Sequence, residues 1–301
     1  MTEERRHLLL VNPSAGAGRV AELLPRAEAA LEANRVRFRR VETRSLEHGV
    51  EEAAAAAAAG EVPVVMSGDG LIGQVGGALA GGDVPMGIMP GGRGNDLARV
   101  VGIPSDPEAA ARLIAEGSTR TIDVGEANGK RFLCIASCGF DSDANRIANE
   151  TKIVKGNLVY FYAALAALAA WKPARFVLTL DGERRELTGF AVAVANSRAY
   201  GGGMFVAPEA ELDDGRFDVV WTERVGKLRF LSQLPKVFKG THTQNPEVGV
   251  ARAAEVRIEA DRDFAVYADG DHLTDLPATV RALPGALRLI APSGPLVGPS
   301  S

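Results

Sequence analysis

Two glycine-rich segments, each directly after an apolar run, carry the residues best suited to bind an anion. Val62–Met66 has the composition of a buried strand, and Ser67, Gly68, Asp69 and Gly70 follow it. Glycine lets the backbone approach a ligand closely, and a helix beginning just afterwards would offer free N–H groups to a phosphate. A carboxylate such as Asp69 would repel a phosphate unless a cation or a hydrogen bond holds it. Taken alone, this segment fits an ordinary Asp-Gly turn equally well.

The same pattern recurs one helix later and favours the functional interpretation. The apolar run Met86–Met89 leads into a second glycine-rich loop that contains Gly92 and Arg93. The guanidinium of Arg93 could meet a phosphate, although a solvated arginine fits equally well. Asn95 or Asp96 can cap the helix that follows. Because both loops would lie at the carboxyl ends of strands in one parallel sheet, we expect them to border one crevice, the usual ligand site of such sheets.

The elements that must position these loops alternate between strand and helix. Such alternation predicts a parallel sheet wrapped by helices. The expected strands are Leu8–Val11, Val36–Val41, Val62–Met66 and Met86–Met89, and the expected helices are Val20–Asn34, Glu47–Ala59, Ile72–Ala80 and a stretch from Asn95 to just before Gly102.

From about Thr121 the pattern changes to short strands separated by Gly, Asp and Asn, which predicts a second, mostly antiparallel β domain. An apolar helix at Leu158–Trp171 and a helical stretch at Val225–Phe238 interrupt the strands. We therefore divide the chain into 1–124, which carries both loops, 125–284, and a C-terminal strand and tail, 285–301, that packs back on the first part. The expected strands here are Phe132–Ala136, Phe176–Leu180, Phe190–Ala195, Phe217–Trp221, Val256–Glu259, Ala265–Tyr267 and Leu287–Ala291.

Composition narrows the class of protein. The chain has 301 residues, 46% hydrophobic and 24% charged, as in an ordinary globular protein. A net charge of −4 argues against a nucleic-acid partner. Cys134 and Cys138 lie in one apolar segment and imply no disulfide framework, which favours a cytoplasmic location. The run Leu158–Trp171 is shorter than the roughly 20 residues that span a bilayer. We therefore expect no transmembrane segment, and membrane contact only at the surface.

Three ordered segments resemble the signatures of the diacylglycerol kinase catalytic-domain family, which shares its nucleotide fold with NAD kinases. They are Asn12–Gly16, Ser67–Gly70 and Gly92–Asp96. The resemblance spans nearly the whole chain and implies an α/β fold, with a doubly wound, mostly parallel N-terminal sheet and a mostly antiparallel β C-terminal domain. Later segments that are similar to family landmarks are Ala207–Val219, Lys239–His242 and Ala268–Asp271.

The resemblance also implies roles for particular residues. ATP would lie across the crevice, and a magnesium ion would be held by Asp214 with backbone groups near Glu211 and Arg216. Asp271 stands where the family has a glutamate that acts as general base on a lipid hydroxyl. Phosphoryl transfer needs mainly positioning and charge neutralisation. The implied nucleotide-binding residues are Asn12, Thr43, Ser67, Gly68, Asp69, Gly70, Gly92, Arg93, Asn95 and Asp96.

Four residues depart from the family pattern. Ser67 and Leu71 replace a glycine and a threonine of the first turn, Arg93 replaces a threonine of the second loop, and Asp271 replaces the glutamate. A leucine cannot donate a hydroxyl proton, and aspartate is shorter than glutamate by one C–C bond, about 1.5 Å. These departures bear on catalysis and leave the fold untouched.

Three functions remain open. The first is an ATP-dependent lipid kinase that phosphorylates a hydroxyl such as that of diacylglycerol, either cytoplasmic or peripheral to the membrane. The second is an NAD-kinase-like enzyme with a soluble substrate, and the third is a nucleotide-binding regulatory protein with little turnover. We prefer the first. A homodimer is compatible with the sequence, since two-fold dimers are the commonest assembly.

Two basic surfaces admit either a structural or a membrane role. Five arginines lie at or near the second expected strand, and a solvated face is the preferred interpretation. In the stretch Val225–Phe238, apolar and basic residues alternate in an amphipathic pattern, for which we prefer docking on the protein's own core to contact with a membrane. The arginines are Arg35, Arg37, Arg39, Arg40 and Arg44.

Overall fold

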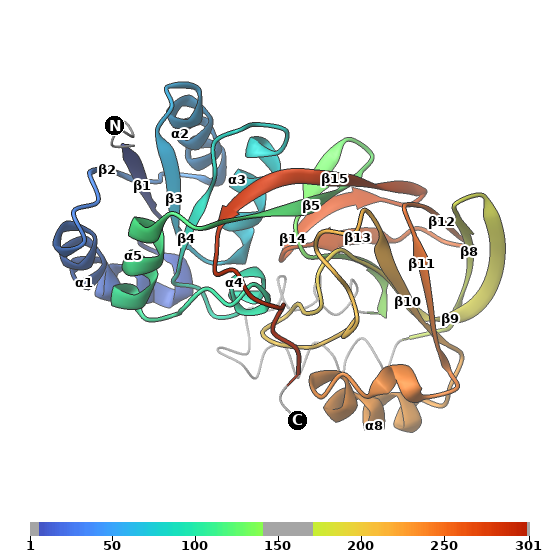
Figure 1. Cartoon of the computed structure of the whole chain (residues 1–301). Coiled ribbons are helices and arrows are strands. Elements are labelled where there is room, and N and C mark those ends of the chain that lie inside the picture. The colour runs from blue at the N-terminus through green and yellow to red at the C-terminus, as the bar shows by residue number, and fades with distance from the viewer. Residues whose placement is uncertain (1–5, 141–170, 300–301) are drawn as a thin grey trace.

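A four-stranded parallel sheet forms the N-terminal half of the protein (Figure 1). The computed structural model describes residues 6–140 and 171–299, so the expected helix Leu158–Trp171 lies outside the described residues except for Trp171. The strand order is β2-β1-β3-β4, and it reverses between β1 and β3. Open parallel sheets bind ligands at such a reversal, beyond the carboxyl ends of the strands. The strands are β1 (His7–Val11), β2 (Phe38–Glu42), β3 (Val62–Ser67) and β4 (Gly87–Pro90).

Helices cover both faces of this sheet, which confirms the doubly wound arrangement. Alternate residues of a strand point to opposite faces, so Leu9 and Val11 pack in one core with α1 and α5, whereas Leu8 and Leu10 pack in another with α2 and α3. Figure 1 shows α1 and α5 together on the left of the sheet. The helices are η1 (Ala15–Gly18), α1 (Arg19–Ala33), α2 (Leu46–Ala58), α3 (Asp69–Leu79), α4 (Asp96–Val100) and α5 (Pro107–Glu116).

Two of these helices differ from expectation. α3 begins at Asp69, directly in the glycine turn and earlier than the predicted Ile72. α5 was not predicted, although Asp106 accepts a hydrogen bond from the backbone N–H of Ala109 (3.0 Å) and Pro107 occupies the first helical position. A capping aspartate followed by proline is a strong signal for the start of a helix.

An antiparallel sheet of eleven strands builds the C-terminal half of the described chain. The order is β14-β13-β7-β9-β8-β12-β15-β5-β6, and β10 pairs with both β9 and β11. A second hydrophobic core, rich in aromatic residues such as Phe176, Phe190 and Phe217, fills its interior. This confirms the mostly antiparallel β domain. The strands are β5 (Thr119–Ala127), β6 (Lys130–Phe132), β7 (Ile135–Gly139), β8 (Ala174–Leu180), β9 (Glu183–Ala195), β10 (Phe217–Glu223), β11 (Val248–Ala253), β12 (Glu255–Ala260), β13 (Ala265–Ala268), β14 (Asp271–Asp275) and β15 (Ala278–Ile290).

The single strand predicted at Phe132–Ala136 is wrong, because the chain forms two strands there. β6 ends at Phe132 and β7 begins at Ile135. Between them, the backbone N–H groups of Leu133 (2.7 Å) and Cys134 (2.9 Å) donate to the carboxylate of Asp269 instead of to a neighbouring strand. A side chain distant in sequence therefore interrupts the strand.

One long ribbon joins the two halves. β15 pairs with β5 from Val280 to Ile290, and its end returns to the parallel sheet. There Met86 donates to Arg288 O and accepts from the N–H of Ile290, each at 2.8 Å. The divisions predicted at residues 124 and 284 fall inside β5 and β15.

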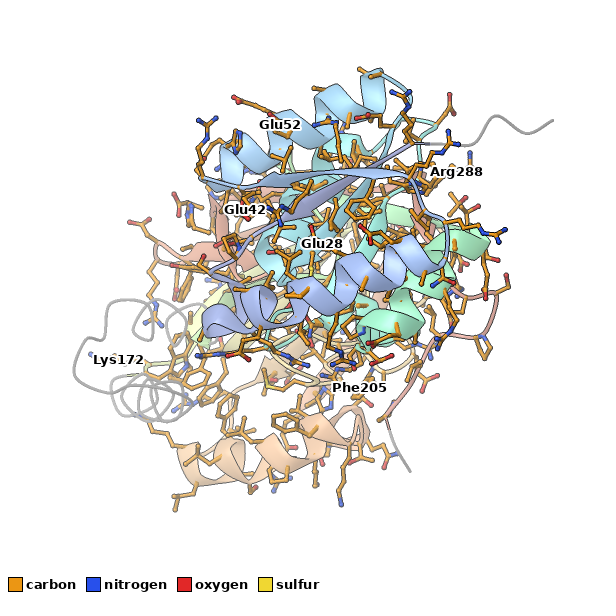
Figure 2. All side chains as sticks on the ribbon, turned by 90° about the vertical axis from the view of Figure 1, so that its left-hand side faces the viewer. Glu28, Glu42, Glu52, Lys172, Phe205 and Arg288 are labelled. Carbon is orange, nitrogen blue, oxygen red and sulfur yellow. The ribbon has the colours of Figure 1, made fainter. Side chains whose placement is uncertain are left out.

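The arginines around β2 form ion pairs with the protein's own acidic residues. Arg39 pairs with Glu52 and Glu61, and Arg40 pairs with Glu28 and Glu42. Glu28, Glu42 and Glu52 lie around β2 in Figure 2. These contacts fit the interpretation of a solvated surface of mixed charge.

The helix expected at Val225–Phe238 is α8 (Lys227–Phe238), and η2 (His242–Gln244) follows it. Phe230 and Leu231 contact the aromatic core, but Leu228 is 84% exposed and Phe238 is 52% exposed. The prediction that this stretch docks on the core is therefore right for only one side of the helix. Within the described part of the chain, no helix combines the length and apolar character needed to cross a bilayer.

Candidate active site

Three loops converge at the carboxyl ends of β1, β3 and β4. The strand register places Val11 opposite Met66, and Met66 opposite Met89, so all three strands end at one level. The backbone oxygen of Ser67, which is buried, accepts hydrogen bonds from the N–H groups of Gly91 (2.9 Å) and Gly92 (3.1 Å). The two glycine loops predicted to border one crevice are therefore in direct contact.

Glycine is required where these loops touch. A Cβ on Gly92 would lie 2.5 Å from the Cα of Gly68, and a Cβ on Gly16 would collide with the backbone oxygen of Gly91. Gly16 also has a positive φ of 64°, a conformation that favours glycine. Glycine therefore lets the backbones of the three loops lie against one another at the carboxyl ends of the strands.

Asp69 joins the first loop to the second. Its Oδ2 accepts from the backbone N–H of Asn95 (2.8 Å), and its Oδ1 accepts from the N–H of Asp96 (2.7 Å). These two N–H groups begin α4, so Asp69 caps a helix that lies 26 and 27 residues further along the chain. Asn95 does not cap α4 with its side chain; its Oδ1 instead accepts from the N–H of Gly92 (2.8 Å). The two hydrogen bonds to Asp69 explain how a carboxylate can be held in this loop without a cation.

Asp96 connects the second loop to the C-terminal half. Its buried carboxylate accepts from the N–H groups of Gly202 (3.0 and 3.1 Å) and Gly203 (2.9 Å). Gly201, Gly202 and Gly203 all have positive φ, which this turn of three glycines permits. Burial raises the pKa of Asp96, the Gly202 N–H opposes the rise, and the charge of Asp69 adds to it.

Asn12 and Thr43 lie at the ends of β1 and β2. Asn12 Oδ1 accepts from the hydroxyl of Ser14 at 2.8 Å and so shapes the loop after β1. The N–H of Thr43 donates to Val11 O at 2.8 Å, which continues the sheet towards the crevice. Both residues are half-buried at the same edge as the glycine loops.

The departures Leu71 and Arg93 occupy different environments. Leu71 is 2% exposed and packs in the core shared with α2, where a Cβ on Gly49 would lie 2.7 Å from Leu71 Cδ1. Its side chain therefore stabilises the fold. Arg93 is exposed at the tip of the second loop and forms no ion pair with the described residues, so its guanidinium can reach a phosphate.

Asp271 brings the C-terminal half to the first loop. A Cβ on Gly70, in the first turn of α3, would lie 3.0 Å from Asp271 Oδ2. Asp271 lies at the start of β14, and burial raises its pKa. A carboxylate of raised pKa next to a helix N-terminus is a suitable acceptor for a proton released beside a bound phosphate.

Sequence reasoning did not assign a role to Asp269, two residues before Asp271. Burial raises the pKa of Asp269 to about 6, while the hydrogen bonds from Leu133 and Cys134 oppose the rise. A Cβ on Gly73 of α3 would lie 2.8 Å from Asp269 Oδ2, so only a glycine leaves room for this carboxylate. Asp269 thus fixes the turn that carries Asp271. The sequence feature that could have identified Asp269 is its position in Ala268–Asp271, a segment that is similar to a family landmark.

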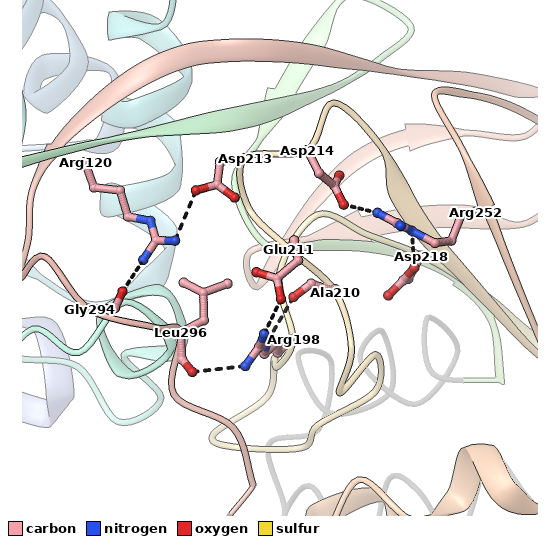
Figure 3. Close-up of polar contacts among 10 residues, drawn as sticks. All are labelled: Arg120, Arg198, Ala210, Glu211, Asp213, Asp214, Asp218, Arg252, Gly294 and Leu296. Carbon is pink, nitrogen blue, oxygen red and sulfur yellow. Dashed lines mark hydrogen bonds and ion pairs between the residues drawn. The ribbon is translucent and has the colours of Figure 1, made fainter.

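The acidic loop predicted to hold magnesium is bound by arginines (Figure 3). Glu211 pairs with Arg198 (2.5 Å). Asp214 pairs with Arg252, and its Oδ1 accepts from the backbone N–H of Arg216 (2.9 Å). Among the described residues, no group of three or more His, Cys, Asp or Glu side chains is arranged to hold a metal ion.

A magnesium ion at Asp214 would therefore have to displace Arg252 from its carboxylate. Carboxylate and backbone oxygens are suitable ligands for magnesium, but both oxygens of Asp214 already accept from N–H donors. The metal site stays a prediction. A second carboxylate in this region was not predicted: Asp123, 1% exposed, accepts from the N–H groups of Gly215 (2.6 Å) and Gly285 (2.7 Å) and ties the acidic loop to the β15 ribbon.

Comparison with known proteins agrees with this architecture in both halves. Residues 6–127 match the diacylglycerol kinase catalytic domain, and residues 134–291 match the YegS C-terminal NAD kinase beta sandwich-like domain. The chain is 39% identical over 247 residues to a diacylglycerol kinase of Mycobacterium tuberculosis, covering 80% of each protein. It is 29% identical over 220 residues to a diacylglycerol kinase of Bacillus subtilis, covering 71% of this chain and 72% of the relative.

A solved structure confirms the fold. The crystal structure of a diacylglycerol kinase from Bacillus anthracis superimposes with a TM-score of 0.77 at 24% identity, covering 97% of this chain and 99% of that one. The fold and the convergent loops define a kinase built from a parallel α/β half and a β-sandwich half. The chain belongs to the diacylglycerol kinase family.

Proposed function

We propose that this protein is an ATP-dependent lipid kinase that transfers the γ-phosphoryl group to a lipid hydroxyl such as that of diacylglycerol, with Mg²⁺ accompanying the nucleotide. The observation that carries the proposal is the approach of Asp271 Oδ2 to Gly70, which brings a carboxylate to the N-terminus of α3. The names of the relatives from Mycobacterium tuberculosis and Bacillus subtilis support the substrate class.

The chain's own groups divide the work as follows. The backbone N–H groups at the N-terminus of α3 bind phosphate oxygens, since those of Gly91, Gly92, Asn95 and Asp96 already donate within the protein. Arg93 adds a positive charge from the tip of the second loop. Mg²⁺, when bound with the nucleotide, supplies neutralisation of phosphate charge. Asp69 holds the two loops at a fixed separation, because its carboxylate binds the N–H groups that begin α4.

The transfer itself needs one base. The lipid hydroxyl oxygen forms a bond to the γ-phosphorus while the bond from that phosphorus to the bridging oxygen of ADP breaks. The hydroxyl proton passes to a carboxylate oxygen of Asp271, and the bond electrons leave with ADP. Such a base contributes on the order of 10²–10⁴ to the rate.

The test is transfer of labelled γ-phosphate from Mg-ATP to a panel of lipids in mixed micelles and of soluble hydroxyl compounds, with Asp69→Ala as the control of lowered ATP affinity. Label in one lipid class that is reduced in Asp69→Ala at limiting ATP supports the proposal and names the substrate. Label in a soluble hydroxyl compound alone replaces it with the NAD-kinase-like function. Binding of ATP without transfer to any acceptor leaves the regulatory function.

A further inference from the structure

α8 carries an apolar stripe that the described residues leave open to solvent. Leu228, Pro235 and Phe238 are exposed and follow one another at spacings that place them along one side of the helix. Leu228 is 84% exposed and Phe238 is 52% exposed, at the two ends of the stripe. Apolar side chains that share one exposed helical face mark an interaction surface more often than apolar side chains scattered singly.

Another side of α8, which carries Phe230 and Leu231, anchors the helix on the aromatic core, so the stripe cannot turn inwards. The Phe230 ring stacks on Phe190 with centroids 4.3 Å apart, and it meets the edge of Phe140 at 4.8 Å. Contacts between aromatic rings of this kind hold a definite geometry. The contacts of Phe230 therefore fix the helix, and the apolar stripe stays exposed to solvent. Figure 1 shows α8 at the bottom of the view, below the strands of the β half.

The charge around the stripe is positive, although the whole chain has a net charge of −4. Between Arg224 and Pro246 the sequence contains lysines and arginines but no aspartate or glutamate. Arg229 pairs with Glu247, and Lys236 donates to the neutral Asn245 at 2.8 Å. A basic, amphipathic helix with leucine and phenylalanine on its apolar face suits the interface of an anionic bilayer. The basic residues are Arg224, Lys227, Arg229, Lys236 and Lys239.

α8 is also connected to the candidate active site. The backbone N–H of Phe205 donates to Val237 O in α8 at 3.1 Å. Phe205 directly follows the turn whose Gly202 and Gly203 bind Asp96, and Figure 2 shows it beside α8. A membrane on the stripe would thus lie near the loop that connects the two halves of the site.

We infer that α8 docks the protein on anionic lipid surfaces, with Leu228 and Phe238 inserted below the headgroups and the surrounding lysines and arginines contacting lipid phosphates. The inference rests on the proposed function, since a kinase with a membrane-resident substrate must reach that membrane. It assigns the contact to one face of one helix.

The test measures co-sedimentation of the full chain with phosphatidylcholine vesicles that contain or lack phosphatidylglycerol. The wild-type protein binds the anionic vesicles. The double variant Leu228→Ser/Phe238→Ser binds about tenfold more weakly, because insertion of apolar side chains is lost. The affinity of the double variant Lys236→Glu/Lys239→Glu for the anionic vesicles falls by about fivefold or more for each altered charge. Leu46→Ser, a leucine 37% exposed on α2, and Lys130→Glu, on β6, are the matched controls and bind like wild type.

Two results would overturn the inference. One is equal binding of the wild type and the stripe variant to anionic vesicles. The other is a loss of self-association in the stripe variant with unchanged vesicle binding, which would assign the stripe to a second copy of this chain. Vesicle binding is measured in the absence of turnover, so it does not depend on the proposed activity.

In the stripe variant we expect phosphoryl transfer to a water-soluble short-chain substrate to be unchanged. A failure of membrane docking can therefore be distinguished from a failure of the proposed activity.

Discussion

Asp69 Oδ1 accepts a hydrogen bond of 2.7 Å from the backbone N–H of Asp96, so a carboxylate from the first glycine loop caps the helix of the second. Hydrogen bonds to a charged acceptor at a helix N-terminus stabilise both the helix and the loop that supplies the carboxylate. The carboxylate of Asp69 therefore acts together with Ser67 O, which binds the N–H groups of Gly91 and Gly92, to fix the separation of the two loops.

We expect Asp69→Ala to lower both stability and nucleotide affinity. Loss of the capping carboxylate leaves the N–H groups of Asn95 and Asp96 without their acceptor, at a cost of about 2 kcal/mol of unfolding free energy. ATP affinity falls about tenfold or more, as measured by calorimetry. Asp106→Ala is the matched control: it removes the capping aspartate of α5 and lowers stability without changing ATP affinity. Unchanged affinity in Asp69→Ala would contradict the positioning role.

Gly94→Ala tests how tightly the carboxylates are packed. A Cβ on Gly94 would lie 2.6 Å from Asp69 Oδ2 and 3.1 Å from Asp96 Oδ2. The methyl group must displace one of these carboxylates, and overpacking of this kind costs about 1–3 kcal/mol. We expect reduced ATP binding and a lower denaturation midpoint. Gly294→Ala, where nothing lies within 4 Å of the added Cβ, retains both properties.

The pH dependence of kcat/KM reports on Asp271. Burial raises the pKa of Asp271, and only the deprotonated form can accept the hydroxyl proton. Activity therefore falls as pH is lowered through the raised pKa and is restored above it. Asp271→Asn lowers kcat on the order of 10²–10⁴-fold. Asp275→Asn, whose side chain is 73% exposed at the other end of β14, is the control and keeps wild-type activity.

Restoring the family's glutamate should not improve the enzyme. Asp271 Oδ2 already lies 3.0 Å from the place of a Cβ on Gly70, so a longer side chain would crowd the first turn of α3. We expect Asp271→Glu to have a kcat no higher than that of the wild type. An increase of tenfold or more would show that the aspartate falls short of its substrate.

The buried carboxylate of Asp218 makes stability depend on pH. Arg252 Nε lies 3.3 Å from Asp218, which is 5% exposed, and burial, followed by the charges of Glu209 and Glu211, raises the pKa of Asp218 to about 6. The unfolded value is near 3.9, so ionisation of Asp218 disfavours folding increasingly as pH rises from about 4 to 6.

Arg252→Ala removes the guanidinium nearest to Asp218 and leaves Arg198 as the remaining positive charge that acts on it, so the unfolding free energy falls by about 1–3 kcal/mol at pH 8. The difference from wild type shrinks towards pH 4, where Asp218 is protonated in both proteins. Denaturant titrations at several pH values measure it. Arg281→Ala breaks an exposed pair with Glu255 and is the control, with a small loss that does not change across this range. A pH-independent loss in Arg252→Ala would sink the assignment.

The glycine loops could be predicted because their signal is local. Strand composition, glycine and a capping residue all occur within one short segment, and the parallel sheet then brings Gly68 and Gly92 together. The start of α5 at Asp106 and Pro107 carried an equally local signal that the sequence analysis missed.

The remaining features depend on partners distant in sequence. The break between β6 and β7 exists because Asp269 binds the N–H groups of Leu133 and Cys134, 136 and 135 residues away. Nothing in the sequence near Phe132 indicates it. In the same way, the pattern of α8 shows apolar residues on two sides but cannot tell which side meets the core, since that depends on Phe190.

The β15 ribbon has a consequence for synthesis on the ribosome. Met86 is followed by β4, the edge strand of the parallel sheet, and its hydrogen-bond partners are Arg288 and Ile290. These partners are made 202 residues later (288 − 86), which takes about 10–40 s at ordinary rates of translation. During that interval the emerging N-terminal half exposes an unpaired strand edge, the kind of surface on which nascent chains associate wrongly. β15 therefore closes a sheet whose other strands are made long before it.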